Sequence, residues 1–167
     1  MVTCWLPNLF ELDLNNWSNT EDVLYDKFVN DFIKGKLYFR GKPLRIRKHP
    51  LVIEREEAFY HVTCKKFEGY SEREPDMRRC ERIDWIKAFI EFYAQCKNCN
   101  KCSGIKIWKT PIDNRIYLLL EEQRYVVILE ERSEYILLIT AFYVDYQNTM
   151  RKLLLKYEKY KNKIDCK

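Results

Sequence analysis

One histidine has both the chemistry and the neighbours expected of an acid–base group. The chain contains 2 His, at positions 49 and 61. His61 lies in the segment Tyr60-His-Val-Thr63, which we interpret as a strand or loop. In an alternating strand, His61 and Thr63 share one face, where Thr63 would help to bind a substrate. An imidazole titrates near pH 6.5, which suits proton transfer at neutral pH, although a structural or surface histidine fits the same pattern.

Three arginines lie just before and within an apolar helical pattern, at positions 78, 79 and 82. On a helix, Arg78 and Arg82 share one face because they are four residues apart, and Arg79 points elsewhere. Guanidinium groups bind phosphate oxygens in a bidentate manner, so we expect this cluster to hold a phosphate. The alternative is a solvated helix face on which Glu81 and Asp84 are the partners.

A hydroxyl group interrupts the most apolar segment of the chain, where Thr140 follows Leu137-Leu-Ile139. We expect Thr140 to lie where this strand leaves the sheet, and to position a substrate or share in proton transfer together with Tyr143. Arg132 and Tyr135, in the preceding turn and strand start, would contribute to substrate binding. Alternatively, the Thr140 hydroxyl bonds only to backbone.

Three of the 7 cysteines follow one another at a spacing of three residues, as Cys96, Cys99 and Cys102. This spacing allows thiolates to close on one Zn²⁺ or on an iron–sulfur cluster. A fourth ligand would be required, for which the candidates are Cys80, Cys64 and His61. A structural zinc, free cysteines in a loop and a redox or iron–sulfur site all remain open at this stage.

Together these residues fit metal-independent cleavage of RNA. The 2′-hydroxyl of ribose attacks the adjacent phosphate, one group removes its proton, and cationic donors stabilise the charge on the phosphorane. No cofactor is required for this reaction. DNA lacks the nucleophile, so the residue set favours RNA as the substrate.

The charge distribution also favours a phosphate-rich partner. The net charge is +5, but residues 34–66 carry +7 and residues 151–167 carry +5. The basic segment includes Arg45 and Arg47, which we expect to bind RNA. Aromatic residues alternate with the bases in both segments, so binding by charge and stacking without cleavage is the main alternative.

The apolar periodicity predicts the elements that must position these groups. A helical spacing covers residues 20–34 and again 76–95, and a basic hairpin is expected at 36–47. Four segments of alternating character predict four strands, with separators short enough for an antiparallel meander. They are 105–108, 115–120, 124–129 and 134–140, followed by a basic helix at 146–161.

This order of elements predicts an α+β fold with helices packed on one face of an antiparallel sheet. We expect a single domain over residues 1–167, with an N-terminal helix and basic hairpin at 1–57 and a nuclease-like core at 58–167. The longest apolar run, residues 135–144, is too short to span a bilayer. With no export signal and an odd number of cysteines, we expect a cytoplasmic protein with reduced thiols and no membrane partner.

Three segments resemble phage- and prophage-type RNases of the barnase–EndoU–colicin–RelE-like superfamily: Tyr60–Cys64, Pro75–Trp85 and Tyr125–Tyr143. The resemblance covers about residues 58–160 and implies a helical N-terminal part, a four-stranded antiparallel sheet and metal-independent ribonuclease chemistry. His61 would match the family's early histidine, Arg78, Arg79 or Arg82 a phosphate-binding base, and Thr140 the last-strand hydroxyl. The basic hairpin and the cysteine cluster are not part of that pattern.

We therefore expect an endoribonuclease, toxin-like or phage-related, which an inhibitor or antitoxin protein could hold silent. His61 would be the general acid or base, with Arg78 and Arg82 on the phosphate. The alternatives are a non-catalytic RNA-binding module and a protein-binding module.

Overall fold

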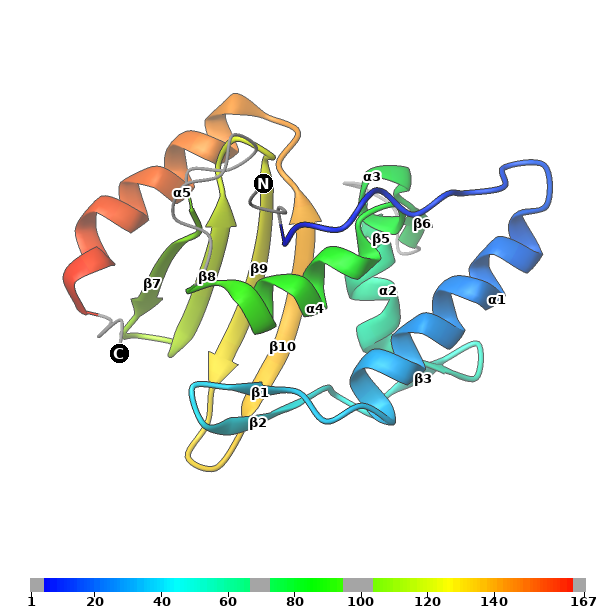
Figure 1. Cartoon of the computed structure of the whole chain (residues 1–167), viewed down its shortest axis with the longest axis horizontal. Helices are drawn as coiled ribbons and strands as arrows, with labels where there is room; N and C mark the ends of the chain where they lie inside the picture. Colours follow the sequence, from blue (N-terminus) through cyan, green and yellow to red (C-terminus); the bar gives the residue numbers. More distant parts are fainter. Residues whose placement is uncertain (1–4, 67–72, 95–103, 164–167) are drawn as a thin grey trace.

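A six-stranded sheet forms the centre of the computed structural model, which describes residues 5–66, 73–94 and 104–163 (Figure 1). The strand order is β1-β2-β10-β9-β8-β7. The strands are β1 Tyr38–Phe39, β2 Lys42–Arg45, β7 Lys106–Thr110, β8 Arg115–Leu120, β9 Tyr125–Glu131 and β10 Ile136–Tyr143. With helices at both ends of the chain, the α+β class expected from the sequence is confirmed.

The four long strands arise from the four alternating segments of the sequence. Each of β7, β8, β9 and β10 pairs antiparallel with the next. The expectation that the last strand ends at Thr140 is wrong, because β10 continues to Tyr143. Its pairing with β9 shifts register between Leu138 and Thr140, so Ile139 is an extra residue of the kind found in a β-bulge.

The basic hairpin is present and extends this sheet. Arg40 and Gly41 join β1 to β2 with φ angles of 52° and 81°, the left-handed conformations that a tight two-residue hairpin turn requires. Strand β2 then pairs parallel with the start of β10, Leu44 opposite Ile136 and Arg45 opposite Leu137. The sequence analysis did not anticipate this long-range pairing.

The N-terminal helix starts earlier than expected. Helix α1 spans Trp17–Phe28, and the Asn16 side chain accepts a hydrogen bond from the backbone of Asn19 at its start. A π-helical turn, η1 Val29–Ile33, continues it. Gly35 follows, and a Cβ there would lie 2.5 Å from the carbonyl oxygen of Asp31, so only glycine fits this exit from the helix.

The helix predicted over 76–95 is two helices in the described part of the chain. They are α3 Met77–Cys80 and α4 Ile83–Phe92. Asp76 caps α3 by accepting hydrogen bonds from the backbone of Arg78 and Arg79. Between the helices, the backbone N–H of Arg82 donates to the carbonyl of Arg79, and that of Trp85 donates to the carbonyl of Arg82. Each of these hydrogen bonds spans three residues, as in a 3₁₀ turn, and tightens the chain there.

The segment around His61 is a helix, α2 Glu57–Thr63, and the interpretation as strand or loop is wrong. Its buried residues, Ala58, Phe59, Val62 and Thr63, form pairs four apart, which is the spacing of a helix face. Seven residues are too few for that period to stand out from alternation. The predicted loop after it contains a strand pair, β5 Cys64–Lys66 with β6 Arg73–Pro75, and a small hairpin of β3 Leu51–Val52 and β4 Arg55–Glu56 precedes α2.

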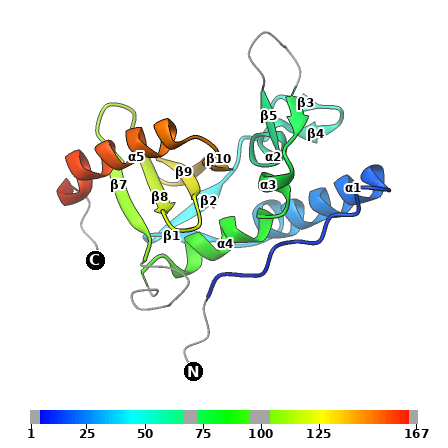
Figure 2. The same ribbon diagram turned by 90° about the horizontal axis from the view of Figure 1, so that it is seen from above.

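Helices cover both faces of the sheet, so the expectation of one covered face is wrong. Leu118 and Leu120 of β8 face α4 in the larger core, whereas Tyr117 and Leu119 face the C-terminal helix. That helix is α5 Gln147–Tyr160, followed by a 3₁₀ turn, η2 Lys161–Lys163, and Figure 2 shows it across the sheet from α4. Within the described ranges, no helix has the length and apolar character of a membrane span.

The larger core combines residues from both ends of the chain. Leu24 and Phe28 of α1 are fully buried in the same cluster as Phe59 of α2 and Leu138 of β10. The rings of Phe28 and Phe59 meet edge to face, with centroids 5.5 Å apart. The N-terminal helix is therefore packed against the elements that carry His61 and Thr140.

Shortening Leu24 to alanine should destabilise the whole protein by about 2–5 kcal/mol, because it leaves a cavity in this shared core. The measurement is urea unfolding followed by circular dichroism. Leu155→Ala is the matched control, since Leu155 is 64% exposed and its loss should cost less than about 0.5 kcal/mol. Equal midpoints for the two variants would show that α1 adds nothing to the core.

Candidate functional site

The backbone carbonyl of His61 is where three of the expected site residues meet. It accepts a hydrogen bond from Thr140 Oγ1 at 2.8 Å and another from Arg79 Nη1 at 2.9 Å. These donors belong to β10 and α3, so one oxygen atom ties α2 to both elements. His61 and Thr140 were predicted to be catalytic and Arg79 to bind substrate, but the two donors bind the backbone of His61. The alternative of a hydroxyl bonded to backbone therefore holds for Thr140.

The bulge in β10 explains how Thr140 reaches α2. Leu138 and Ala141 both lie in the larger core, although residues three apart on a regular strand face opposite sides. The extra residue at Ile139 resets the alternation, and bulges commonly re-aim a neighbouring side chain. The Thr140 hydroxyl is thereby directed to the helix beside the strand.

The imidazole of His61 is partly accessible and lies among charges. Its side chain is 34% exposed, and Nε2 lies 3.8 Å from Glu57 Oε1, one helical turn earlier. Burial lowers the pKa of His61 below its ordinary value, and the positive charges of Arg73, Arg47 and Arg79 lower it further, while Glu57 opposes them. His61 is therefore neutral at pH 7 and able to accept a proton.

The arginines around His61 come from three different parts of the chain. Arg47 lies two residues after the end of β2, the strand that pairs parallel with the start of β10. Arg73 begins β6, and Arg79 lies in α3. Arg47 was predicted to bind substrate, whereas Arg73 and Glu57 were missed. Glu57 could have been found from its spacing of four residues before His61, had the segment been interpreted as a helix.

Arg79 is largely buried and serves the fold. Besides its bond to His61, its guanidinium lies 3.6 Å from Asp76 and 5.4 Å from the ring of Phe142. Burial lowers the pKa of Arg79 below its ordinary value, and the Asp76 carboxylate opposes this. Its expected role in substrate binding is corrected to one of holding α3 against α2.

Arg78, Arg82 and Tyr143 form a second group, in which both guanidinium groups stack on one ring. They lie 4.3 Å and 4.8 Å from the ring centroid of Tyr143, and Arg82 also lies 5.0 Å from that of Trp85. Arg82 pairs with Glu81, the partner named in the alternative, but it is buried and does not lie on a solvated face. The side chain of Arg78 is 53% exposed, so Arg78 and Tyr143 are the accessible members of this group.

Arg132 and Tyr135 lie at the other end of β10. Arg132 pairs with Glu130, and its backbone N–H donates to the carbonyl of Tyr135 across the turn between β9 and β10. Thr140, the β10 residue that bonds to His61, lies five residues after Tyr135, about 16 Å along the strand at roughly 3.3 Å per residue. Arg132 and Tyr135 are therefore not part of the group around His61. Arg45 is exposed. It lies opposite Leu137, so it is closer to the turn between β9 and β10 than Thr140 is.

Thr63 and Cys80 are internal. The hydroxyl of Thr63 donates to the carbonyl of Phe59 at 2.9 Å, and the Cys80 thiol donates to the carbonyl of Thr63 at 3.3 Å. Burial raises the pKa of Cys80 to about 12, so this thiol keeps its proton at neutral pH, whereas a metal binds the thiolate. Cys96, Cys99 and Cys102 lie outside the described residues, and the zinc site stays a prediction.

No family model, no curated protein and no solved structure matches this chain. The resemblance to phage-type RNases accordingly remains an expectation from sequence.

Changing the charges around His61 should move its pKa in opposite directions. Arg73→Gln removes a positive charge and should raise the pKa, whereas Glu57→Gln removes the opposing negative charge and should lower it further. The measurement is an NMR titration of the imidazole, assigned with a His49→Gln variant. Because the folded-state pKa lies below that of the unfolded chain, stability should rise with pH between the folded value and about 6.5. Shifts of the same sign in both variants would contradict this description.

Replacing Thr140 by valine should remove the hydrogen bond to His61 and destabilise the fold by about 1 kcal/mol. Thr140→Ser keeps the hydroxyl and should lose less stability. Both are measured by urea unfolding. A valine variant as stable as the wild type would mean that this bond does not help to hold α2 on the sheet.

Proposed function

We propose that the protein is a metal-independent endoribonuclease with His61 as its proton acceptor. The observation that carries this proposal is the accessible, neutral imidazole of His61 among the charges of Arg47, Arg73 and Arg79. A neutral imidazole can remove a proton, and guanidinium groups nearby attract and stabilise a phosphate. This combination suits a phosphodiester as substrate.

The reaction would follow from that arrangement. His61 takes the proton of a ribose 2′-hydroxyl while its oxygen attacks the adjacent phosphorus. The bond from phosphorus to the 5′ oxygen breaks, the leaving oxygen takes a proton from water, and a 2′,3′-cyclic phosphate remains. Arg47, which is exposed, and Arg73 would hold the phosphate oxygens and stabilise the charge that develops on them.

The stack of Arg78 on Tyr143 would bind RNA beside this centre. An arginine plane on an aromatic ring is a surface on which unpaired bases stack, and Arg78 also offers a charge to the backbone. Arg78 directly precedes Arg79 in α3, and Tyr143 ends β10 three residues after Thr140. This places the stack on the elements adjoining His61.

A non-catalytic RNA-binding module is the second candidate. It is favoured by the internal use of Thr140 and Arg79, both of which donate to a backbone carbonyl and so contribute nothing to proton transfer. The same basic and aromatic groups would then bind RNA without cleaving it. An inhibitor or antitoxin partner remains a prediction.

Incubation of RNA with the wild-type protein in EDTA should give products ending in 2′,3′-cyclic phosphate. His61→Gln should reduce the rate by about 10²–10⁴-fold, the usual contribution of one acid–base group. The rate should fall as the pH drops through the pKa of His61, which lies below the ordinary value of about 6.5, and Arg73→Gln should move this limb toward higher pH.

His49→Gln is the matched control, because His49 is the other histidine of the chain and its side chain is exposed. Its rate should equal that of the wild type. RNA that stays intact but is retained in a salt-dependent manner would favour the binding module. Cleavage that EDTA abolishes would refute the metal-free mechanism.

A further inference from the structure

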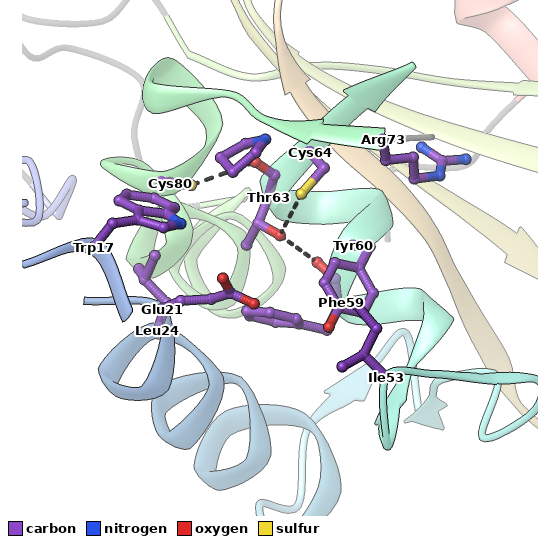
Figure 3. Close-up of a pocket in the computed structure, with 11 residues that line it drawn as sticks. Trp17, Glu21, Leu24, Ile53, Phe59, Tyr60, Thr63, Cys64, Arg73 and Cys80 are labelled. Atoms are coloured by element: carbon purple, nitrogen blue, oxygen red, sulfur yellow. Dashed lines mark hydrogen bonds between the residues drawn. The ribbon is translucent and has the colours of Figure 1, made fainter. Parts of the chain in front are cut away.

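A small cavity lies between α1, α2 and the β5–β6 pair (Figure 3). Tyr60, the residue before His61, is part of its lining. The volume of the cavity is about 160 Å³. Aromatic rings of Trp17, Phe59 and Tyr60 form much of its wall, together with apolar side chains. Of the residues that line it, the proposed reaction at His61 uses Arg73.

The size of the cavity selects its occupant. A cavity of about 150 Å³ lined by apolar side chains holds one benzene ring. The cavity beside α2 therefore takes one six-membered ring and is too small for the fused rings of a purine. Flat aromatic walls are also the surfaces on which unpaired RNA bases stack.

Two cysteines complete the apolar lining. Cys64 and Cys80 both lie along the cavity, and burial raises the pKa of each thiol. They are uncharged at neutral pH and present weakly polar sulfur to a bound ring. A neutral heterocycle in the cavity therefore meets no charged group where Cys64 and Cys80 line it.

The carboxylate of Glu21 supplies the polar recognition. Figure 3 shows it extending from α1 toward Phe59 and Tyr60 on α2. Arg55 Nη1 donates a hydrogen bond to Glu21 Oε1 at 3.1 Å, which orients the carboxylate. Among the described residues, the Glu21 side chain makes no other hydrogen bond. The second oxygen, Oε2, can accept a hydrogen bond from a ligand.

A carboxylate distinguishes the two pyrimidines of RNA. Cytosine carries an exocyclic amino group that donates hydrogen bonds, and glutamate is a known partner of that group. Uracil carries a carbonyl oxygen at the same position, which a carboxylate repels. The cavity therefore favours cytosine over uracil.

Two shared residues connect the cavity to the proposed reaction centre. Tyr60 lines the cavity and precedes His61 in α2. Arg73 also lines the cavity, and its charge acts on His61. A nucleotide with its base in the cavity would place its phosphate toward Arg73.

We infer that the cavity lined by Trp17, Glu21 and Tyr60 binds the cytosine base of an RNA. The inference rests on the proposed function for the identity of the polymer, but the recognition of cytosine can be measured separately. Cleavage would then follow cytosine, because the bound base belongs to the nucleotide whose 2′-hydroxyl reacts.

The test compares cytidine 3′-monophosphate with uridine 3′-monophosphate by isothermal titration calorimetry on the full chain. The wild type should bind the cytidine compound about 10-fold more tightly, in line with one good polar contact to a base. Glu21→Gln should bring the two affinities close together, because an amide can both donate and accept. Asp22→Asn is the matched control: Asp22 also pairs with Arg55 but does not line the cavity, so the preference should persist.

Cleavage mapping on an RNA with scattered cytosines completes the test. Cuts after cytosine that lose their preference in Glu21→Gln support the inference. Equal binding of both nucleotides with cleavage at all bases would overturn the cytosine subsite and leave the proposed function intact. Tight cytidine binding without any cleavage would support the subsite and overturn the ribonuclease. If an oligouridine with one cytosine binds no better than oligouridine while the free nucleotide binds, the ligand is a nucleotide and the RNA assignment fails.

Discussion

The carbonyl oxygen of His61 is the point on which the arrangement of the site depends. Helix α2 packs against β10, and the bond from Thr140 fixes it there. The bond from Arg79 fixes α3 to the same turn of α2. A carbonyl with two lone pairs satisfied by two donors leaves the helix little freedom to slide or rotate. The backbone that carries the His61 side chain is held in place as a result.

Placing Arg79 inside the molecule has an electrostatic consequence. A buried guanidinium is costly unless it is paired, and Asp76 lies 3.6 Å from it and at the same time caps α3. The positive charge of Arg79 still lowers the pKa of His61, in the same direction as the charges of Arg47 and Arg73. A contact that stabilises the fold thus also keeps the imidazole neutral, so structure and chemistry are coupled at one arginine.

The sequence predicted the parts of this arrangement that depend on local pattern. Strand β8 matches its predicted segment, Arg115–Leu120, because an apolar run from Ile116 to Leu120 is bounded by polar turns. The helix around His61 was missed because it is seven residues long, and Arg73 was missed because its segment is polar and carries no periodic signal. The parallel pairing of β2 with β10 joins residues about ninety positions apart, and no local pattern encodes it. The choice of His61 rested on residue type alone and its catalytic role stays a prediction, while its neighbours depended on long-range contacts.

Helix α1 gives the two sides of α2 different environments. Phe28 and Leu24 seal one part of the interface with Phe59, but packing is incomplete where Trp17 and Glu21 approach Tyr60. Filling this space with a larger apolar side chain would gain buried area, whereas the sequence places there a carboxylate that Arg55 orients. A polar group directed into an apolar space costs stability unless it has a partner. The cost is offset when a ligand with a donor group occupies the cavity, and such a ligand would be bound by the same helix that positions His61.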